Sequence, residues 1–542
     1  MPEGDAKDPR VAPVALFELV LALLAAALVL SGFASRTVLP PAAALVLGGM
    51  ALALVPGVPA FDLDPDLILV LFLPPLLMAS AYGTAWRDFR AEMVPILVMA
   101  VGAVAFTTFC VGFAVHAVAP GLPLAACFTL GAIVSPPDAV AAKAVLQRLK
   151  LPRRLVTILE GESLVNDASG LVLYRFSVAA AMTGTFSAGE AVARFVWLAV
   201  GGIGFGLLAG YLVIQVLRRI HDADFATALT LMMSWAIYIG AERLGASGVL
   251  AVVAAGILFG LMQHAALGAS FRVQAGAFWE VIVYVLEALV FVLIGLALRG
   301  VLDRQAGTAL ATALPITLAA IAVVVASRLI WVMLVATAPG LLPARMRAPN
   351  SRPSLLPPLM VGWAGMRGVV TLAVALALPA AFPERDQLLL ASFAVILFTV
   401  LVQGTTLGPL IRLSRLDTLE EPGREPLNEA AARVAIVQAA LSNLEAMIGP
   451  DGPLHPQLID EYRRRLTATT RLRDDPAASG QRRTAHFAAA LAVTARGRAE
   501  LIRLHREGQI HDSVLRLLEG EFDLEELRLR SLGKLAANAA AH

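Results

Sequence analysis

Apolar stretches of membrane length recur along the first 412 residues and are separated by short polar loops. A helix needs ~20 mostly apolar residues to cross a bilayer. This rule predicts an all-α membrane domain with about thirteen spans, near residues 14–34, 38–56, 65–82, 93–118, 122–145, 155–182, 188–217, 224–242, 245–263, 277–298, 307–337, 357–381 and 387–412. The first stretch lacks a basic start and a clear cleavage site, so we interpret it as a retained span.

The pattern changes after residue 415. Residues 416–542 carry 17 Lys or Arg and 19 Asp or Glu, with helical apolar spacing near 425–448, 456–473, 479–507 and 511–532. We therefore expect two domains, a transmembrane domain at 1–415 and a soluble helical cytoplasmic domain at 416–542. The mixed charge favours solvated helices over a nucleic-acid surface. The tail has no glycine-rich phosphate loop and no Cys/His metal spacing, and no cofactor is expected.

Composition supports the membrane assignment. The chain is 58% hydrophobic and 15% charged with a mean hydropathy of +0.76, whereas soluble domains carry about a quarter charged residues. The two cysteines, Cys110 and Cys127, lie in apolar stretches, which favours small core residues over a disulfide or a metal pair.

Basic residues in alternate loops predict the orientation, because cytoplasmic loops carry the excess of Lys and Arg. The richer set is Arg36, Arg87, Arg90, Lys143, Arg148, Lys150, Arg153, Arg154, Arg218, Arg219, Arg272, Arg345, Arg347 and Arg352. The poorer set is Lys7, Arg10, Arg243, Arg299, Arg304 and Arg385. This predicts a multi-pass protein of the cell membrane with its N-terminus outside and its C-terminus in the cytoplasm.

A polar heptapeptide, Gly-Glu-Ser-Leu-Val-Asn-Asp at 161–167, interrupts the sixth apolar stretch. Carboxylates at membrane depth are costly and usually mark an ion or proton path. Ser163 and Asp167 are four residues apart, as are Glu162 and Asn166, so each pair lies on one strip of a helix. Hydroxyl and carboxylate oxygens suit a monovalent cation, and this cluster of polar groups exceeds what helix packing needs.

Two further segments are broken. Ser135-Pro136-Pro137-Asp138 interrupts the fifth stretch, where proline removes backbone donors. Three glycines surround Arg367 in the twelfth stretch, at residues 362–368. Paired interruptions of this kind are typical of transporters with inverted repeats, here two six-helix repeats joined by one linking helix.

Buried charges need partners in a membrane. We predict a structural ion pair between Glu162 and Arg367, which leaves Asp138 and Asp167 for the ion path. Glu287 and Arg328 also lie deep in their apolar stretches, where a charged side chain is expected to have a partner or a function.

Asp138, the 161–167 motif and Gly365-Met366-Arg367-Gly368 together resemble the monovalent cation:proton antiporter-1 family, which includes bacterial NhaP-type proteins and animal sodium/proton exchangers. The resemblance covers most of residues 14–412. It implies an NhaA-like antiporter fold with thirteen spans and a homodimer. It also implies alternating access by a core domain that moves against a dimerisation domain.

Position by position, Asp167 resembles the ion-binding carboxylate, Asn166 its amide neighbour and Ser163 a cation-ligating hydroxyl. Asp138 resembles the aspartate at the helix crossover, and Glu287 resembles a glutamate of the animal exchangers. The resemblance implies Na⁺, K⁺ or Li⁺ held by Asp167, Ser163 and Asp138, in exchange for H⁺. Asn166 stands where electrogenic members of the wider superfamily carry another aspartate, which implies electroneutral exchange.

Two departures from the family pattern stand out. Ala139 follows Asp138 where the family commonly has proline, and Ala79 occupies a position after Pro74-Pro75 where many members have an acid. The second change leaves cation selectivity open, and a K⁺-selective antiporter is the alternative to sodium exchange. An intramembrane aspartyl protease would use Asp138 and Asp167 as a dyad, but neither acid has the Tyr-Asp or Gly-x-Gly-Asp context. A channel would need a filter sequence, and the chain shows no repeated one.

Overall fold

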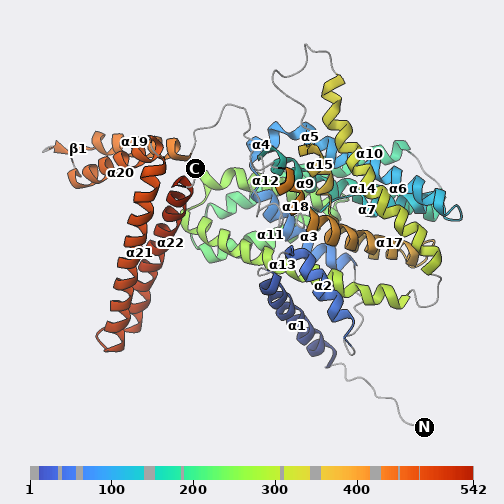
Figure 1. Ribbon diagram of the computed structural model, residues 1–542, viewed down its shortest axis with the longest axis horizontal. Coiled ribbons are helices and arrows are strands. Elements are labelled where there is room, and N and C mark those ends of the chain that lie inside the picture. Colours follow the sequence, from blue (N-terminus) through green and yellow to red (C-terminus); the bar gives the residue numbers. More distant parts are fainter. Residues whose placement is uncertain are drawn as a thin grey trace, which may run out of the picture. The chain divides into compact units, whose positions relative to one another are not determined.

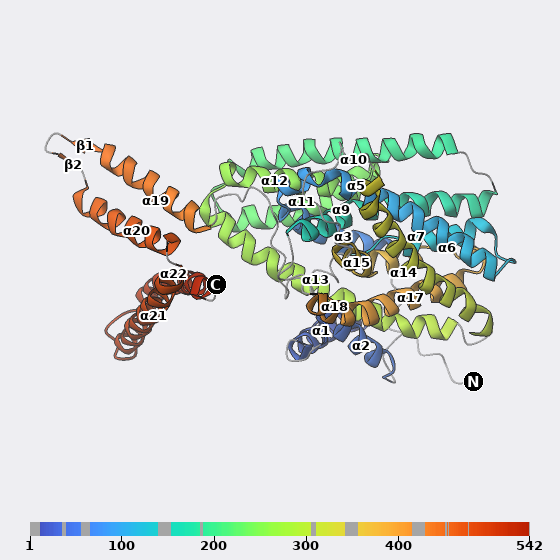
Figure 2. The same cartoon turned by 45° about the horizontal axis from the view of Figure 1, so that its top comes forward.

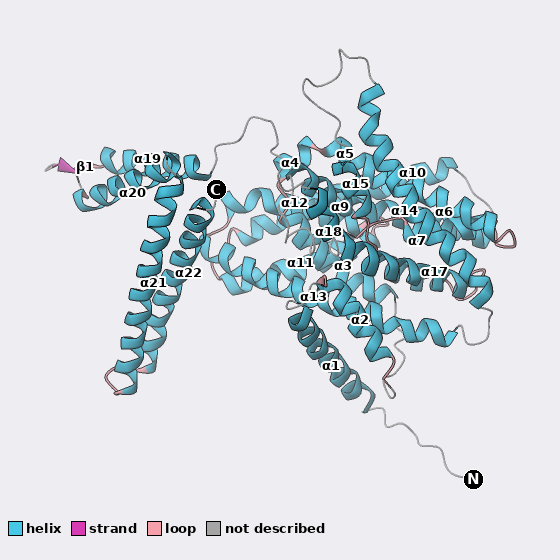
Figure 3. Ribbon diagram, viewed as in Figure 1, coloured by secondary structure: helices cyan, strands magenta, loops and turns pink. Residues whose placement is uncertain are grey.

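The computed structural model describes residues 11–34, 39–55, 65–138, 153–184, 188–304, 310–341, 356–414, 429–449, 452–453, 455–474 and 476–540. These residues are overwhelmingly helical (Figure 3). The chain divides into two compact units, Met1–Glu420 and Glu421–His542.

The first unit is a bundle of apolar helices (Figure 1). Its elements are α1 (Val11–Ala34), α2 (Pro41–Ala53), α3 (Pro65–Tyr82), α4 (Trp86–Ala91), α5 (Met93–Leu97), η1 (Val98–Ala103), α6 (Val104–Val118), α7 (Leu124–Val134), α9 (Arg153–Thr183), α10 (Ala188–Leu217), α11 (Ala223–Arg243), α12 (Gly248–Ala266), α13 (Ala269–Arg304), α14 (Leu310–Leu341), α15 (Leu356–Trp363), α16 (Val369–Leu376), α17 (Arg385–Phe398), η3 (Thr399–Gln403) and α18 (Gly404–Ser414). Every apolar stretch picked out from the sequence overlaps at least one of them.

Six helical stretches among the described residues are long and apolar enough to cross a membrane alone, and shorter apolar helices accompany them. The number of crossings and the two six-helix repeats therefore stay predictions. The two interruptions predicted from the sequence are confirmed. Helix α7 ends at Val134, and the rest of that stretch lies outside the described residues from residue 139. Helix α15 ends at Trp363, and α16 begins only at Val369.

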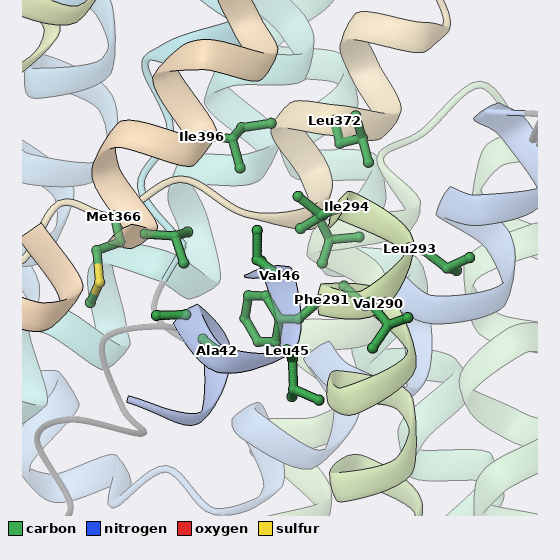
Figure 4. Close-up of a cluster of buried hydrophobic side chains, with 14 of the residues drawn as sticks. Ala42, Leu45, Val46, Val290, Phe291, Leu293, Ile294, Met366, Leu372 and Ile396 are labelled. Carbon is green, nitrogen blue, oxygen red and sulfur yellow. The ribbon is translucent and has the colours of Figure 1, made fainter. Parts of the chain in front are cut away.

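A buried apolar cluster joins α2 to α13 and extends to the broken segment before α16 (Figure 4). Gly49 on α2 and Gly295 on α13 lie where these helices cross. A Cβ atom on either glycine would overlap the backbone of the other helix. The absence of side chains at these two positions therefore allows the close approach.

Two other apolar clusters separate the remaining helices of the first unit into two groups. One cluster is built mainly from α3, α10, α11, α12 and α13, and α12 packs along α10 (Figure 2). The other is built from α6, α7, α14, α16 and α17 and includes Tyr174 of α9. Helix α9 contributes to both clusters, through Leu164 and Ala168 to the first and Tyr174 to the second. It therefore lies between the two groups.

The second unit contains α19 (Glu429–Ala446), α20 (Pro456–Asp474), α21 (Pro476–Arg506) and α22 (Asp512–Ala540), with two-residue strands β1 (Ile448–Gly449) and β2 (Gly452–Pro453) between α19 and α20. Helices α21 and α22 pack side by side (Figure 1). Gly508 adopts a φ of 72° in the turn between them, a conformation that glycine accepts without strain. The four stretches predicted to be helical in the tail each overlap one of these helices.

Candidate functional site

The two broken segments meet inside the first unit. The backbone N–H of Asp138, just beyond α7, donates to the carbonyl oxygen of Met366, between α15 and α16, at 2.6 Å. The break after α7 and the break before α16 therefore pass against each other. Irregular backbone at membrane depth is tolerated where its polar groups find protein partners or line a cavity.

Arg367 stabilises this crossing through backbone carbonyls. Its guanidinium donates to Val134 O at 2.8 Å, to Ser135 O at 3.3 Å and to Gly365 O, and its side chain is fully buried. Val134 and Ser135 end α7, where helical carbonyls lack intrahelical partners and carry partial negative charge. Arg367 therefore caps the broken end of α7 with a positive charge.

Asp138 lies against the start of α16. A Cβ atom on Gly368, the residue that precedes α16, would overlap the Asp138 carboxylate. Helix N-termini carry partial positive charge that favours a nearby carboxylate. The crossing thus has a cationic side chain at the end of one half-helix and an anionic side chain at the start of the other.

Asn166 and Asp167 face this crossing from α9. The Asn166 amide nitrogen donates to the carbonyl oxygen of Pro137 at 2.6 Å, which ties α9 to the break after α7. The Asn166 Oδ1 atom is buried and accepts no hydrogen bond from any described residue. Asp167 is 7% exposed, and the Asp138 carboxylate is close enough to interact with it electrostatically. An amide oxygen and two carboxylates therefore converge at the crossing.

The predicted ion pair between Glu162 and Arg367 is wrong. Glu162 instead forms a two-pronged pair with Arg328 of α14, at 2.6 and 2.9 Å, and both side chains are buried. Gly365 makes room for Arg328, since a Cβ atom there would overlap its side chain. Arg367 is held by the crossing because the broken helices leave carbonyls that need donors. The linear sequence contains two deep arginines and does not show which one faces Glu162.

Other candidate residues lie around this centre. Ser163 is half-buried, one turn before Asp167 on α9, and Ala79 is half-buried on α3. Glu287 is half-buried on α13. The roles of Ser163 and Glu287 in the site stay predictions.

Sequence reasoning missed Thr399. Its hydroxyl oxygen accepts the backbone N–H of Arg367 at 3.0 Å, and the residue is fully buried at the start of η3. Its signal in the sequence is a hydroxyl inside an apolar stretch. Because a threonine hydroxyl can also satisfy its own helix, that signal does not distinguish a structural hydroxyl from one that supports the site. Thr399 also makes that local bond, to Ile396 O at 3.1 Å.

Two half-helices that cross beside a buried aspartate, in a bundle of apolar helices, define a secondary transporter for small cations. The solved structure of the sodium proton antiporter MjNhaP1 from Methanocaldococcus jannaschii has this fold. It matches 75% of this chain and 100% of its own length with a TM-score of 0.59, at 19% identity.

Sequence comparison identifies the family. The model of the transmembrane sodium/hydrogen exchanger family matches residues 19–413. An uncharacterized Na⁺/H⁺ exchanger of Mycobacterium tuberculosis is 33% identical over 94% of this chain and 95% of its own length. A sodium, potassium, lithium and rubidium/H⁺ antiporter of Bacillus pumilus is 32% identical over 80% of this chain and 66% of its own length. The chain belongs to the sodium/hydrogen exchanger family and is a multi-pass membrane antiporter, not an enzyme.

Proposed function

We propose that Asp167 carries both substrates of this antiporter in turn, a monovalent cation on one leg of the cycle and a proton on the other. The observation that carries this proposal is the position of Asp167, buried beside Asn166 at the crossing of the two broken helices. Burial disfavours the charged carboxylate, and a bound cation favours it. Cation binding therefore expels the proton, and cation release admits one.

The cation site consists of oxygens from Asp167, Asn166, Ser163 and Asp138. The Asn166 Oδ1 atom supports this assignment, because it is a buried acceptor without a described donor. A buried carbonyl oxygen of this kind is costly unless it finds a donor or a cation. Glu287 belongs to the pathway, in line with its match to a glutamate of the animal exchangers.

Transport proceeds by alternating access. The helices that share the cluster around α6, α7, α14, α16 and α17 move with the crossing, against the helices grouped around α3 and α10–α12. The protein works as a homodimer in the cell membrane, for cation and pH homeostasis. Its N-terminus is outside and its C-terminus is in the cytoplasm, in line with the distribution of Lys and Arg along the loops. Residues 416–542 form a soluble cytoplasmic domain.

Sodium is the favoured cation, and potassium is the alternative because the Bacillus pumilus relative is named for both. Everted membrane vesicles that contain the protein, loaded with a pH-sensitive dye, test the activity directly. Addition of sodium, lithium or potassium should move protons and dequench the dye, and the half-maximal concentrations rank the cations. Vesicles that show no response to any of the three would contradict the proposal.

A further inference from the structure

A cavity of about 510 Å³ lies among the helices of the first unit. Four helices line it: α9 with Leu171 and Arg175, α16 with Val374, α3 with Val70 and α11 with Glu242. Helix α16 belongs to the group that includes α7, and α9, which carries Asn166 and Asp167, lies between the two groups, whereas α3 and α11 belong to the other group. The cavity therefore lies on the boundary between the two groups.

Two of the helices that line the cavity also carry or adjoin residues of the crossing. Leu171 lies one turn beyond Asp167 on α9, and Arg175 lies one turn further, ~12 Å from Asp167 at 1.5 Å per residue. Val374 lies six residues after Gly368 on α16, ~9 Å along that axis. Both helices thus lead from the crossing into the same cavity, as expected of a vestibule through which a cation reaches the site.

An ion pair crosses the boundary at this cavity. Arg175 of α9 donates to the Oε2 atom of Glu242 at 3.1 Å, and the two side chains are 47% and 26% exposed. The other carboxylate oxygen of Glu242 accepts the backbone N–H of Gly248 at 3.0 Å, at the start of α12. Glu242 is therefore fixed to the α11–α12 pair, and Arg175 is the long side chain that reaches it from the helix of Asp167.

We propose that Arg175 and Glu242 are positioning residues of the antiport cycle, a latch across the vestibule that stabilises the state in which the vestibule is open. The inference rests on the proposed alternating access, because α9 cannot move against α11 without breaking the pair. Because both side chains of the pair are partly exposed, the pair contributes little to the free-energy difference between the open and closed states. A reversible transport cycle requires that this difference be small. Breaking the latch shifts the population towards the state in which the vestibule is closed.

The test measures the accessibility of a cysteine in the vestibule. Leu171→Cys is introduced into a Cys110→Ala, Cys127→Ala background, and a membrane-impermeant, negatively charged thiol reagent is applied to each face of sealed vesicles. The Leu171→Cys protein labels from a given face only when the vestibule opens to that face. Arg175→Gln and Glu242→Gln should each slow labelling about two- to fivefold, the range expected for an exposed pair. Each should also raise the apparent KM for a cation supplied at that face, with a smaller change in kcat.

The two variants separate a latch from a local charge effect. Loss of Arg175 alone would repel the anionic reagent and loss of Glu242 would attract it, so a pure charge effect changes the two rates in opposite directions. A latch slows both. Glu242→Gln keeps an oxygen for the Gly248 N–H, and Arg175→Lys keeps the positive charge and should restore most of the labelling. Arg218→Gln, at an exposed arginine whose guanidinium donates to Gln215 Oε1 at 3.5 Å, is the matched control and should label like the Leu171→Cys parent.

If both variants label at the rate of the Leu171→Cys parent, or if their labelling rates change in opposite directions, the proposed latch is wrong. Absence of labelling from either face would overturn the open vestibule. Proton movement on cation addition is measured in the same vesicles before labelling. A parent protein without antiport contradicts the proposed function, whereas a parent with antiport and unchanged labelling contradicts the latch alone.

Discussion

At the residue scale, two neighbouring buried side chains of α9 have different roles. Asn166 is tied by its amide nitrogen to the break after α7, which leaves its oxygen at the crossing. Asp167, the next residue, is a buried carboxylate that can change its protonation state. An amide cannot titrate, so of these two neighbours only Asp167 can exchange a cation for a proton.

Replacement of Asp167 by asparagine should abolish exchange and leave the fold intact. The substitution keeps the size of the side chain and removes the charge that a cation needs. The measurement is dye dequenching in proteoliposomes that contain the purified variant. Its thermal unfolding in detergent, compared with the parent protein, is the control for folding. Retained exchange in a correctly folded Asp167→Asn protein would exclude Asp167 as the shared site.

We predict that the buried pair between Glu162 and Arg328 stabilises the fold. Removing one partner leaves the other charge buried, which typically costs ~3–5 kcal/mol. Glu162→Gln and Arg328→Gln should therefore each lower the unfolding temperature, and the double variant should be more stable than either single one. The exposed pair between Arg463 and Glu445 provides a control, since Arg463→Gln should change the unfolding temperature little. Single variants that melt like the parent protein would show that the buried pair is dispensable.

At the scale of the elements, the crossing depends on complementary ends. Arg367 caps the carbonyls that α7 leaves open, and Gly368 lets the Asp138 carboxylate approach the first turn of α16. The backbone bond from Asp138 to Met366 then joins the two breaks. The half-helices are thus held by backbone contacts around a small set of side chains.

Gly368→Ala tests this close approach. The added methyl group would overlap the Asp138 carboxylate, so either the carboxylate or α16 must shift. We expect a loss of exchange of at least tenfold, measured in proteoliposomes, because a displacement of ~1 Å at a reacting site can cost a factor of 100. Gly404→Ala is the matched control, because its nearest contact is the flexible side chain of Met366. Equal losses in both variants would mean that the close approach at Gly368 has no special role.

At the scale of the whole molecule, the stoichiometry of exchange decides whether a transport cycle carries net charge across the membrane. The proposed cycle returns one proton for each cation on a single carboxylate, so no net charge crosses the membrane. A potential imposed on proteoliposomes at fixed ion gradients should leave the rate and the reversal point unchanged. A rate or a reversal point that follows the potential would contradict one-for-one exchange.

The sequence by itself determined the local features. Apolar length located the helices, and the prolines at 136–137 and the glycines around Arg367 located both interruptions, because these properties act on the chain where they occur. It also singled out Asp138, Asn166 and Asp167 as polar residues at membrane depth.

Only the tertiary structure decided which residues form ion pairs and hydrogen bonds with one another. The sequence contains two deep arginines, Arg328 and Arg367, and more than one deep glutamate. A pairing between distant helices depends on how those helices pack. The structure assigns Glu162 to Arg328 and Arg367 to the open carbonyls of α7. The hydroxyl of Thr399 and the ion pair between Arg175 and Glu242 likewise depend on contacts between segments far apart in the chain. The physical reason is that hydropathy and charge are properties of single residues, whereas the fold decides which donor satisfies a buried charge.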